Sequence, residues 1–137
     1  MKTTVLSQQS PKIDYPIKSL RRAELALKDS PFCLVLFVAM RLGSVPLPLI
    51  ANQSGLIEGY TEKFLSERRV EVELTWLIQV GLLRREVDGQ GITDSFRLTP
   101  LGKYLVEQWE KQGPTWKKIT LGQRLINRFQ RWFPWFF

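Results

Sequence analysis

The sequence predicts a mostly α-helical fold with a small antiparallel β-hairpin, and three features carry this prediction. Apolar residues recur at helical spacing before Gly81, which supplies the positive φ that a helix C-terminus favours. Asp88-Gly89 is a hairpin signal, although the polar residues around it favour a loop longer than two residues. Apolar and polar residues then alternate over residues 95–98, as in a half-buried strand.

The hairpin leads into two further predicted helices. Thr99 is a good N-cap, and Pro100 follows it. Proline is tolerated at the first position of a helix, because a backbone N–H there would have no partner within the helix. We therefore expect a helix from Pro100 to Gln112, stopped by Gly113-Pro114. A final helix is expected from Thr120 to about Phe133, which Pro134 ends.

The first half of the chain predicts three helices after a polar arm over residues 1–15. We expect the first helix over residues 16–29. The second is apolar nearly all round and is expected from Pro31 to Leu42, with Ser30 as its cap and Gly43 at its end. The third is expected from Pro46 to Gln53.

The apolar stretch from Phe32 to Ala51 is better explained by a buried helix than by a membrane span. Gly43, Pro46 and Pro48 interrupt the stretch. Arg41 near its centre would cost about 2.5–3.5 kcal/mol on the membrane-insertion scale. The N-terminus lacks the long apolar run of a signal peptide.

Several of these segments together resemble the winged helix-turn-helix regulators of the MarR and PadR type, over about residues 46–105. The matching segments are Ala51–Leu56, Leu77–Leu82, Arg84-Arg85, the turn at Asp88-Gly89 and Leu98–Gly102. The resemblance implies a winged helix with extra N- and C-terminal helices, DNA binding through a recognition helix and wing, and a homodimer. Winged helices also serve as protein-binding modules, so the resemblance leaves function less defined than fold.

One segment departs from these regulators. Gly55 and Gly81 are separated by twenty-five residues, and the extra length lies around Ile57 to Ser66. The recognition helix is either extended at its front or preceded by a loop. Ser66 and Thr61 are both suitable caps, and the sequence does not decide between them.

Composition argues against an enzyme, a metal site and a bound cofactor. The chain of 137 residues has no histidine, the usual general base and zinc ligand. It has no phosphate-binding glycine loop, no CxxC pair and no nucleophile elbow. The single cysteine, Cys33, is expected to be a buried inert thiol, which fits a cytoplasmic location.

The net charge of +7 favours an anionic partner, but its excess lies in the flanking segments. Residues 1–30 hold six basic and three acidic groups, residues 31–113 nine basic and ten acidic, and residues 114–137 five basic and none acidic. We treat these segments as an N-terminal arm and helix (1–29), a winged-helix domain (30–113) and a basic aromatic C-terminal helix (114–137).

Candidate DNA contacts follow from the resemblance and from charge. Glutamates at positions 62, 67, 71 and 73 oppose phosphate binding unless they lie on the outer face. For the wing arginines, phosphate contact and a solvated strand face are equally open interpretations. The nucleic-acid candidates are Thr61, Lys63, Arg68 and Arg69 near the major groove, Arg84 and Arg85 on the wing, and Lys117 and Lys118 as added charge.

The C-terminal segment is aromatic as well as basic, because seven of the sixteen aromatic residues lie in the last twenty-four positions. Three interpretations are open: a dimerisation or packing helix, an interfacial membrane anchor, or base stacking on single-stranded nucleic acid. The residues expected to make dimer or membrane contacts are Leu121, Leu125, Phe129, Trp132, Phe133 and Trp135.

These observations lead to one expectation for function and one alternative. We expect a non-enzymatic winged-helix protein that binds double-stranded DNA as a homodimer and regulates transcription. The alternative is a winged-helix protein–protein adaptor, associated with a membrane surface through its C-terminal helix. The predicted core consists of Phe32, Leu36, Phe37, Leu77, Leu82, Phe96, Leu98, Leu101 and Leu105.

Overall fold

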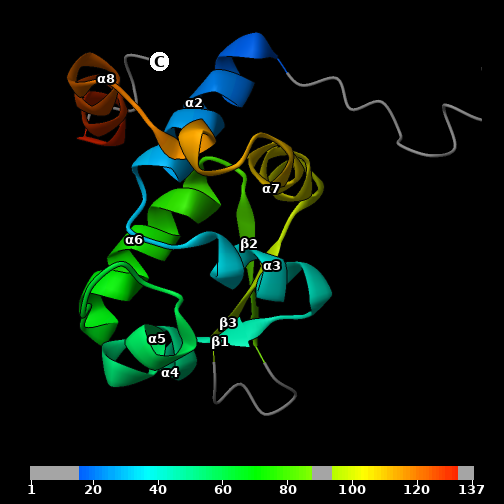
Figure 1. Ribbon diagram of the computed structural model, residues 1–137, viewed down its shortest axis with the longest axis vertical. Coiled ribbons are helices and arrows are strands. Elements are labelled where there is room, and N and C mark those ends of the chain that lie inside the picture. The colour runs from blue at the N-terminus through cyan, green and yellow to red at the C-terminus, as the bar shows by residue number, and fades with distance from the viewer. Residues whose placement is uncertain (1–15, 88–93, 133–137) are drawn as a thin grey trace, which may run out of the picture.

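The computed structural model describes residues 16–87 and 94–132, and it has the predicted mostly α-helical fold with a small antiparallel sheet (Figure 1). The order helix, strand, helices and hairpin is that of a winged helix, with added helices before and after it. The elements are α2 (Ile17–Asp29), α3 (Leu34–Leu42), β1 (Val45–Pro46), α4 (Leu47–Ile50), α5 (Asn52–Glu58), α6 (Glu67–Gln79), β2 (Leu83–Val87), β3 (Asp94–Leu98), α7 (Pro100–Gln112), the 3₁₀ helix η1 (Pro114–Lys117) and α8 (Leu121–Trp132).

The predicted hairpin is confirmed. β2 and β3 pair antiparallel, in a register that runs from Leu83 opposite Leu98 to Val87 opposite Asp94. The expected Asp88-Gly89 turn lies outside the described residues. β1 adds a third strand on the other side of β3, with Val45 opposite Phe96. A strand of two residues is too short to show alternation, so the sequence did not predict it.

The predicted start of the second helix is wrong. α3 begins after Cys33, and Ser30 instead ends α2, since its N–H and its hydroxyl donate to the Leu27 carbonyl at 3.2 and 2.9 Å. A residue before proline favours extended backbone, and Ser30 has a ψ of 154°. The chain then runs extended through Phe32, which forms an isolated antiparallel bridge with Thr61.

The predicted helix from Pro46 to Gln53 is two short helices, α4 and α5. They are separated at Ala51, whose ψ is 164°, and at Asn52, whose φ is 60°. Gly55 lies inside α5, where a Cβ would approach the Ile50 carbonyl oxygen to 1.9 Å, so this position requires glycine. The turn comes at Gly59, which is left-handed with a φ of 78°.

The long segment before α6 is a loop, so the alternative with Ser66 as the cap is confirmed. The Ser66 hydroxyl accepts the backbone N–H of Arg69 at 3.1 Å, and α6 begins at Glu67. A second predicted cap is also confirmed, because the Thr99 hydroxyl accepts the Gly102 N–H at 3.1 Å. The same hydroxyl lies 2.6 Å from the Gly81 carbonyl oxygen, which ties the end of α6 to the start of α7.

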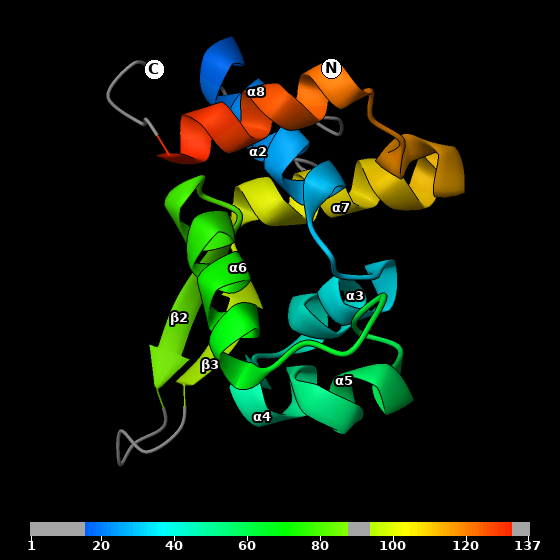
Figure 2. The same ribbon diagram turned by 90° about the vertical axis from the view of Figure 1, so that its left-hand side faces the viewer.

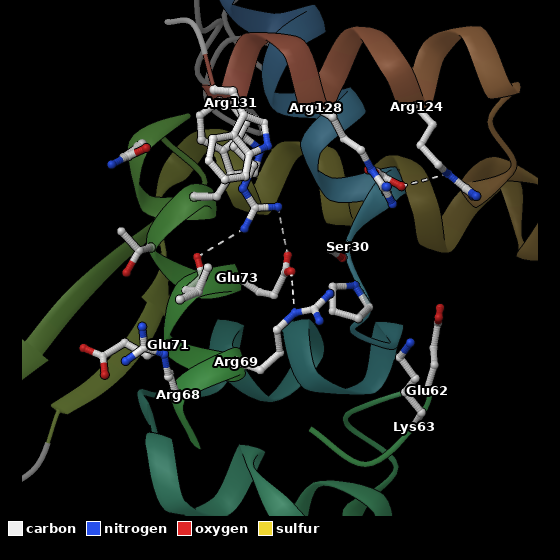
Figure 3. A pocket seen from close by; sticks show the side chains of 17 residues that line it. Ser30, Glu62, Lys63, Arg68, Arg69, Glu71, Glu73, Arg124, Arg128 and Arg131 are labelled. Carbon is white, nitrogen blue, oxygen red and sulfur yellow. Dashed lines mark hydrogen bonds and ion pairs between the residues drawn. The ribbon is translucent and has the colours of Figure 1, made fainter. Parts of the chain in front are cut away.

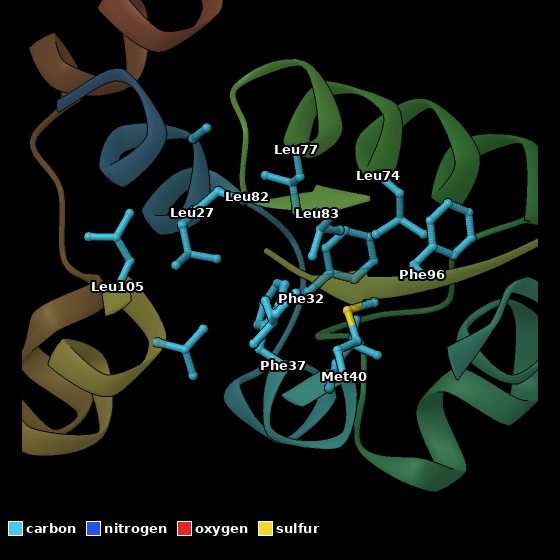
Figure 4. Close-up of a cluster of buried hydrophobic side chains, with 14 of the residues drawn as sticks. Leu27, Phe32, Phe37, Met40, Leu74, Leu77, Leu82, Leu83, Phe96 and Leu105 are labelled. Carbon is cyan, nitrogen blue, oxygen red and sulfur yellow. The ribbon is translucent and has the colours of Figure 1, made fainter. Parts of the chain in front are cut away.

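One hydrophobic core joins these elements, and the nine side chains predicted for it are all buried (Figure 4). α3, α4, α6 and α7 contact the sheet strands around this core. α2 adds Ala23, Ala26 and Leu27 to the same cluster, so the N-terminal helix packs as part of the domain. α2, α7 and α8 lie at one end of the molecule, and α4 and α5 lie at the other (Figure 2).

Arg41, the charge within the long apolar stretch, lies at the surface of α3. Its guanidinium donates two hydrogen bonds, of 2.7 and 2.8 Å, to the Glu110 carboxylate on α7. These bonds lower the pKa of Glu110 below its usual range. Among the described residues, no helix has the length and apolar character needed to cross a bilayer.

Replacing Leu77 by alanine should lower the free energy of unfolding by about 2–5 kcal/mol, because its side chain is fully buried and a cavity would remain. Urea unfolding followed by far-UV circular dichroism measures this change. Val72→Ala removes an exposed side chain from the same helix and should change stability by less than about 0.5 kcal/mol. Equal effects of the two substitutions would contradict the packing of α6.

Candidate nucleic-acid interface

α6 presents one face to the core and the opposite face to solvent. Val70, Leu74 and Leu77 point inward at helical spacing and are buried. The opposite side carries a ridge of four side chains, Arg68, Val72, Thr75 and Gln79, that are exposed or half-exposed. The polar side chains of this ridge form no hydrogen bond or ion pair with any residue that the structure describes. The ridge is therefore available to a partner.

An open groove of about 950 Å³ lies beside the ridge, between α6 and α8 (Figure 3). α6 supplies one wall, α8 the other, and the loop before α6 adds residues at one end. The groove is lined by six basic side chains and four acidic ones, so positive charge is in excess. The basic residues are Lys63, Arg68, Arg69, Arg124, Arg128 and Arg131, and the acidic residues are Asp29, Glu62, Glu71 and Glu73.

Glu73 joins α6 to α8 across this groove. Its carboxylate is 8% exposed and accepts hydrogen bonds from Arg69 at 2.9 Å and from Arg131 at 3.2 Å (Figure 3). The Arg131 guanidinium also lies 5.9 Å from the centre of the Trp76 ring. A buried carboxylate needs such partners, because burying an unpaired charge is strongly unfavourable.

Asn127 and Asp29 complete the attachment of α8. Asn127 is 1% exposed, accepts the indole N–H of Trp76 at 3.2 Å and donates to Asp29 at 2.9 Å. Asp29 also pairs with Arg124 at 3.0 Å and, more distantly, with Arg128 at 3.8 Å. α8 is thus attached to α2 and α6 through its polar face.

Two of the residues predicted on or near the recognition helix are exposed and unpaired among the described residues. These are Arg68 at the start of α6 and Lys63 in the preceding loop. Arg69 is half-exposed and is bound by Glu73. The prediction for Thr61 is wrong, because this side chain is 5% exposed and its backbone pairs with Phe32. Thr61 is therefore a buried structural residue of the loop before α6 and does not face solvent.

The two wing arginines differ in what holds them. Arg84 is mostly exposed and has Glu86 as its neighbour at 3.1 Å. Arg85 is held on the opposite face of β2, where it donates to Asp94 at 2.6 Å and lies 3.7 Å from Glu71. Its guanidinium also lies 5.2 Å from the centre of the Phe96 ring. Arg84 is thus the more available cation of the pair.

Lys117 was expected to be a solvent-exposed cation that adds positive charge to the interface, but its ammonium group is bound within the protein. Its ammonium donates to the Ser30 carbonyl at 2.6 Å and to the Glu62 carboxylate at 2.7 Å. It also lies 5.9 Å from the centre of the Trp109 ring. Lys117 therefore anchors η1 to the domain, whereas Lys118 is exposed.

The residues expected to make dimer or membrane contacts are exposed where the structure describes them. Leu121, Leu125 and Phe129 are exposed on α8, and Trp132 is exposed at the edge of the groove. Phe133 and Trp135 fall outside the described residues.

Val72, Thr75 and Gln79 were not among the site residues predicted from the sequence. They are neutral, and charge was the criterion for choosing candidates. Their signal was their spacing of four, seven and eleven residues from Arg68, which places all four on one helical face. The α8 arginines share a flank in sequence, but only the tertiary arrangement brings that flank to α6.

Cys33 is half-buried, so the expectation of a buried thiol was too strong. Its pKa is raised by burial and by the nearby negative charge of Glu62, which makes the reactive thiolate scarce at neutral pH. Among the described residues, no group of three or more metal-binding side chains comes together.

This arrangement defines a small winged-helix fold with an exposed ridge on α6 and a groove beside it in which basic side chains outnumber acidic ones. The chain belongs to the Npun_F0494-like family, whose model matches residues 13–131. No curated protein and no solved structure matches the sequence. The resemblance to MarR and PadR regulators stays a prediction.

Replacing Asn127 by alanine should loosen α8, because the Trp76 N–H would lose a buried partner at a cost of about 1–3 kcal/mol. Backbone amide exchange in residues 121–132 should quicken by roughly tenfold or more, while α6 stays protected. Ile126→Ala, at the exposed neighbouring position, is the control and should leave the exchange rate unchanged. Equal exchange in wild type and Asn127→Ala would show that these polar contacts do not hold the helix.

Proposed function

We propose that the chain is a non-enzymatic winged-helix protein that binds double-stranded DNA by inserting α6 into the major groove. The single observation that carries this proposal is the unpartnered ridge of α6, formed by Arg68, Val72, Thr75 and Gln79. A polar ridge on the solvent side of this helix is where a winged helix that reads DNA places its base-contacting side chains.

The side chains of the ridge have the chemistry of base recognition. Arginine donates two hydrogen bonds to guanine, and glutamine exchanges two with adenine. Threonine bonds to either kind of base, and an aliphatic group such as that of Val72 packs against the thymine methyl. At a rise of 1.5 Å per residue, Arg68 and Gln79 lie about 16 Å apart along the helix, a span of roughly five base pairs.

Phosphate contacts are available on both sides of the ridge. Arg84 extends from the wing, and Arg128 extends from α8 with only a distant carboxylate at 3.8 Å. Lys63 lies in the loop before α6. Cations that flank a recognition helix fix its position on the duplex, while the helix itself reads the bases.

The glutamates that argued against DNA binding are largely neutralised by neighbouring cations. Glu73 accepts from two arginines, Glu62 pairs with Lys117 at 2.7 Å, and Glu71 lies 3.7 Å from Arg85. Of the four glutamates at positions 62, 67, 71 and 73, only Glu67 has no cation partner within the described part of the chain. Glu67 lies in the first turn of α6, where the helix dipole favours a negative charge.

Regulation of transcription, a homodimer and a cytoplasmic location remain predictions attached to this proposal. The alternative is a protein–protein adaptor associated with a membrane surface. It is favoured by one observation, the exposed apolar side chains of α8.

A DNA-binding titration over a range of salt tests the proposal. Wild-type protein should bind random duplex at low salt, with the logarithm of affinity falling linearly with the logarithm of salt concentration. Arg84→Ala should reduce that slope by about 0.9, the value of one phosphate contact. Adding Arg85→Ala should change the slope little further, because Arg85 is already held by Asp94.

Arg68→Ala should weaken binding to a selected site by about 1–3 kcal/mol, because it removes a base or phosphate contact at the front of α6. Lys103→Ala removes an equal charge from the exposed side of α7 and serves as the control, which should bind as wild type does. No binding by the folded wild-type protein at low salt would overturn the proposal and favour the adaptor.

A further inference from the structure

The faces of α8 are inverted relative to an ordinary packed helix. Its polar side lies against the domain, where Asn127 is 1% exposed and Gln130 is 8% exposed. Its apolar side points outward, with Leu121 at 72%, Leu125 at 59% and Trp132 at 73% exposure. A helix normally buries its apolar stripe against its own protein, so this outer face needs another occupant.

The charge around this apolar face is positive. The segment from residue 114 to the end of the chain holds five basic residues and no acidic one. Arg128 lies on the flank of the apolar stripe and is largely exposed, and Arg124 beside it is half-exposed. Exposed lysine at position 118 precedes the helix. An occupant that is both apolar and anionic would match this face.

We propose that α8 binds the surface of an anionic lipid bilayer, with its axis parallel to the membrane plane. Leu121, Leu125 and Trp132 would enter the boundary between headgroups and acyl chains, and Arg128 would meet lipid phosphates. A strongly amphipathic helix with arginine beside leucine and tryptophan is typical of interfacial binding. This inference does not depend on DNA binding by α6.

A second copy of the chain matches the face less well than a bilayer does. α8 contains three arginines and no carboxylate, so the flanks of two facing helices offer no opposite charge to each other. An antiparallel two-fold pair would bring Arg124 and Arg128 of both copies to the same edge. Like charges at a close interface are unfavourable, whereas anionic headgroups neutralise them.

The place of α8 in the molecule suits a planar partner. α8 lies at the end of the molecule opposite α4 and α5, with its outer side away from the domain (Figure 2). The five residues that follow Trp132 in sequence include four aromatic ones. Tryptophan and other aromatic side chains are favoured at the interface between lipid and water.

Vesicle co-sedimentation of the full chain tests the proposal, with mixed phosphatidylglycerol and phosphatidylcholine vesicles compared with phosphatidylcholine alone. The wild-type chain should sediment with the anionic vesicles, and added salt should weaken binding. The double substitution Leu121→Ser with Leu125→Ser should lower the partition coefficient at least about tenfold. The matched control is Leu42→Ser with Ile57→Ser, at positions 82% and 80% exposed on α3 and α5, and should bind as wild type does.

Circular dichroism and DNA affinity of the double variant provide a second measurement. An unchanged fold and unchanged DNA affinity, together with lost vesicle binding, would support the proposal. The proposal is overturned if the wild-type chain ignores anionic vesicles or if the double variant binds them equally well. It is also overturned if light scattering finds a dimer that the double substitution dissociates while no variant binds lipid, since a second copy would then cover the face.

Discussion

The buried carboxylate of Glu73 is the constraint on which the candidate interface depends. It lies on the flank of α6 and accepts from Arg69 on its own helix and from Arg131 on α8. Removing either arginine would leave a buried charge with fewer partners, which is far more costly than losing a surface ion pair. The basic flank of α8 is thereby fixed toward α6. Because Asn127 and Gln130 lie on the buried side of α8 and Leu121 and Leu125 on the exposed side, the same attachment turns the apolar side outward.

Two surfaces of different chemistry follow from this one attachment. On the inner side, arginines from α8 face α6 across a groove and add positive charge beside the ridge that begins at Arg68. On the outer side, Leu121 and Leu125 are exposed. Asn127 makes both surfaces possible, since it satisfies the indole N–H of Trp76 and one oxygen of Asp29 in the contact between them. α8 therefore shapes the groove beside α6 and also exposes an apolar face.

The parts of the fold that depend on local chemistry were predictable from the sequence. Thr99 caps α7, and alternation at residues 95–98 forms β3, because caps and strand periodicity involve residues near one another in the chain. The failures have two sources, which are competing local contacts and contacts between residues distant in the sequence. Ser30 closes α2 rather than opening α3, Gly55 is needed for the approach of α5 to the Ile50 carbonyl, and Thr61 is covered by its bridge to Phe32. Lys117 was counted as free charge because nothing in its neighbourhood in sequence indicates Glu62, which is 55 residues away.

The most direct test of the α6 ridge is a two-dimensional ¹H–¹⁵N spectrum of the labelled chain titrated with a short DNA duplex. The proposed interface predicts that the backbone amides of Arg68, Thr75 and Gln79 and those of the wing strands shift together and saturate. The amides of α7, away from the ridge, should stay in place. Shifts confined to α8, or no shifts at low salt in a folded protein, would contradict the proposal that α6 is the DNA-binding element.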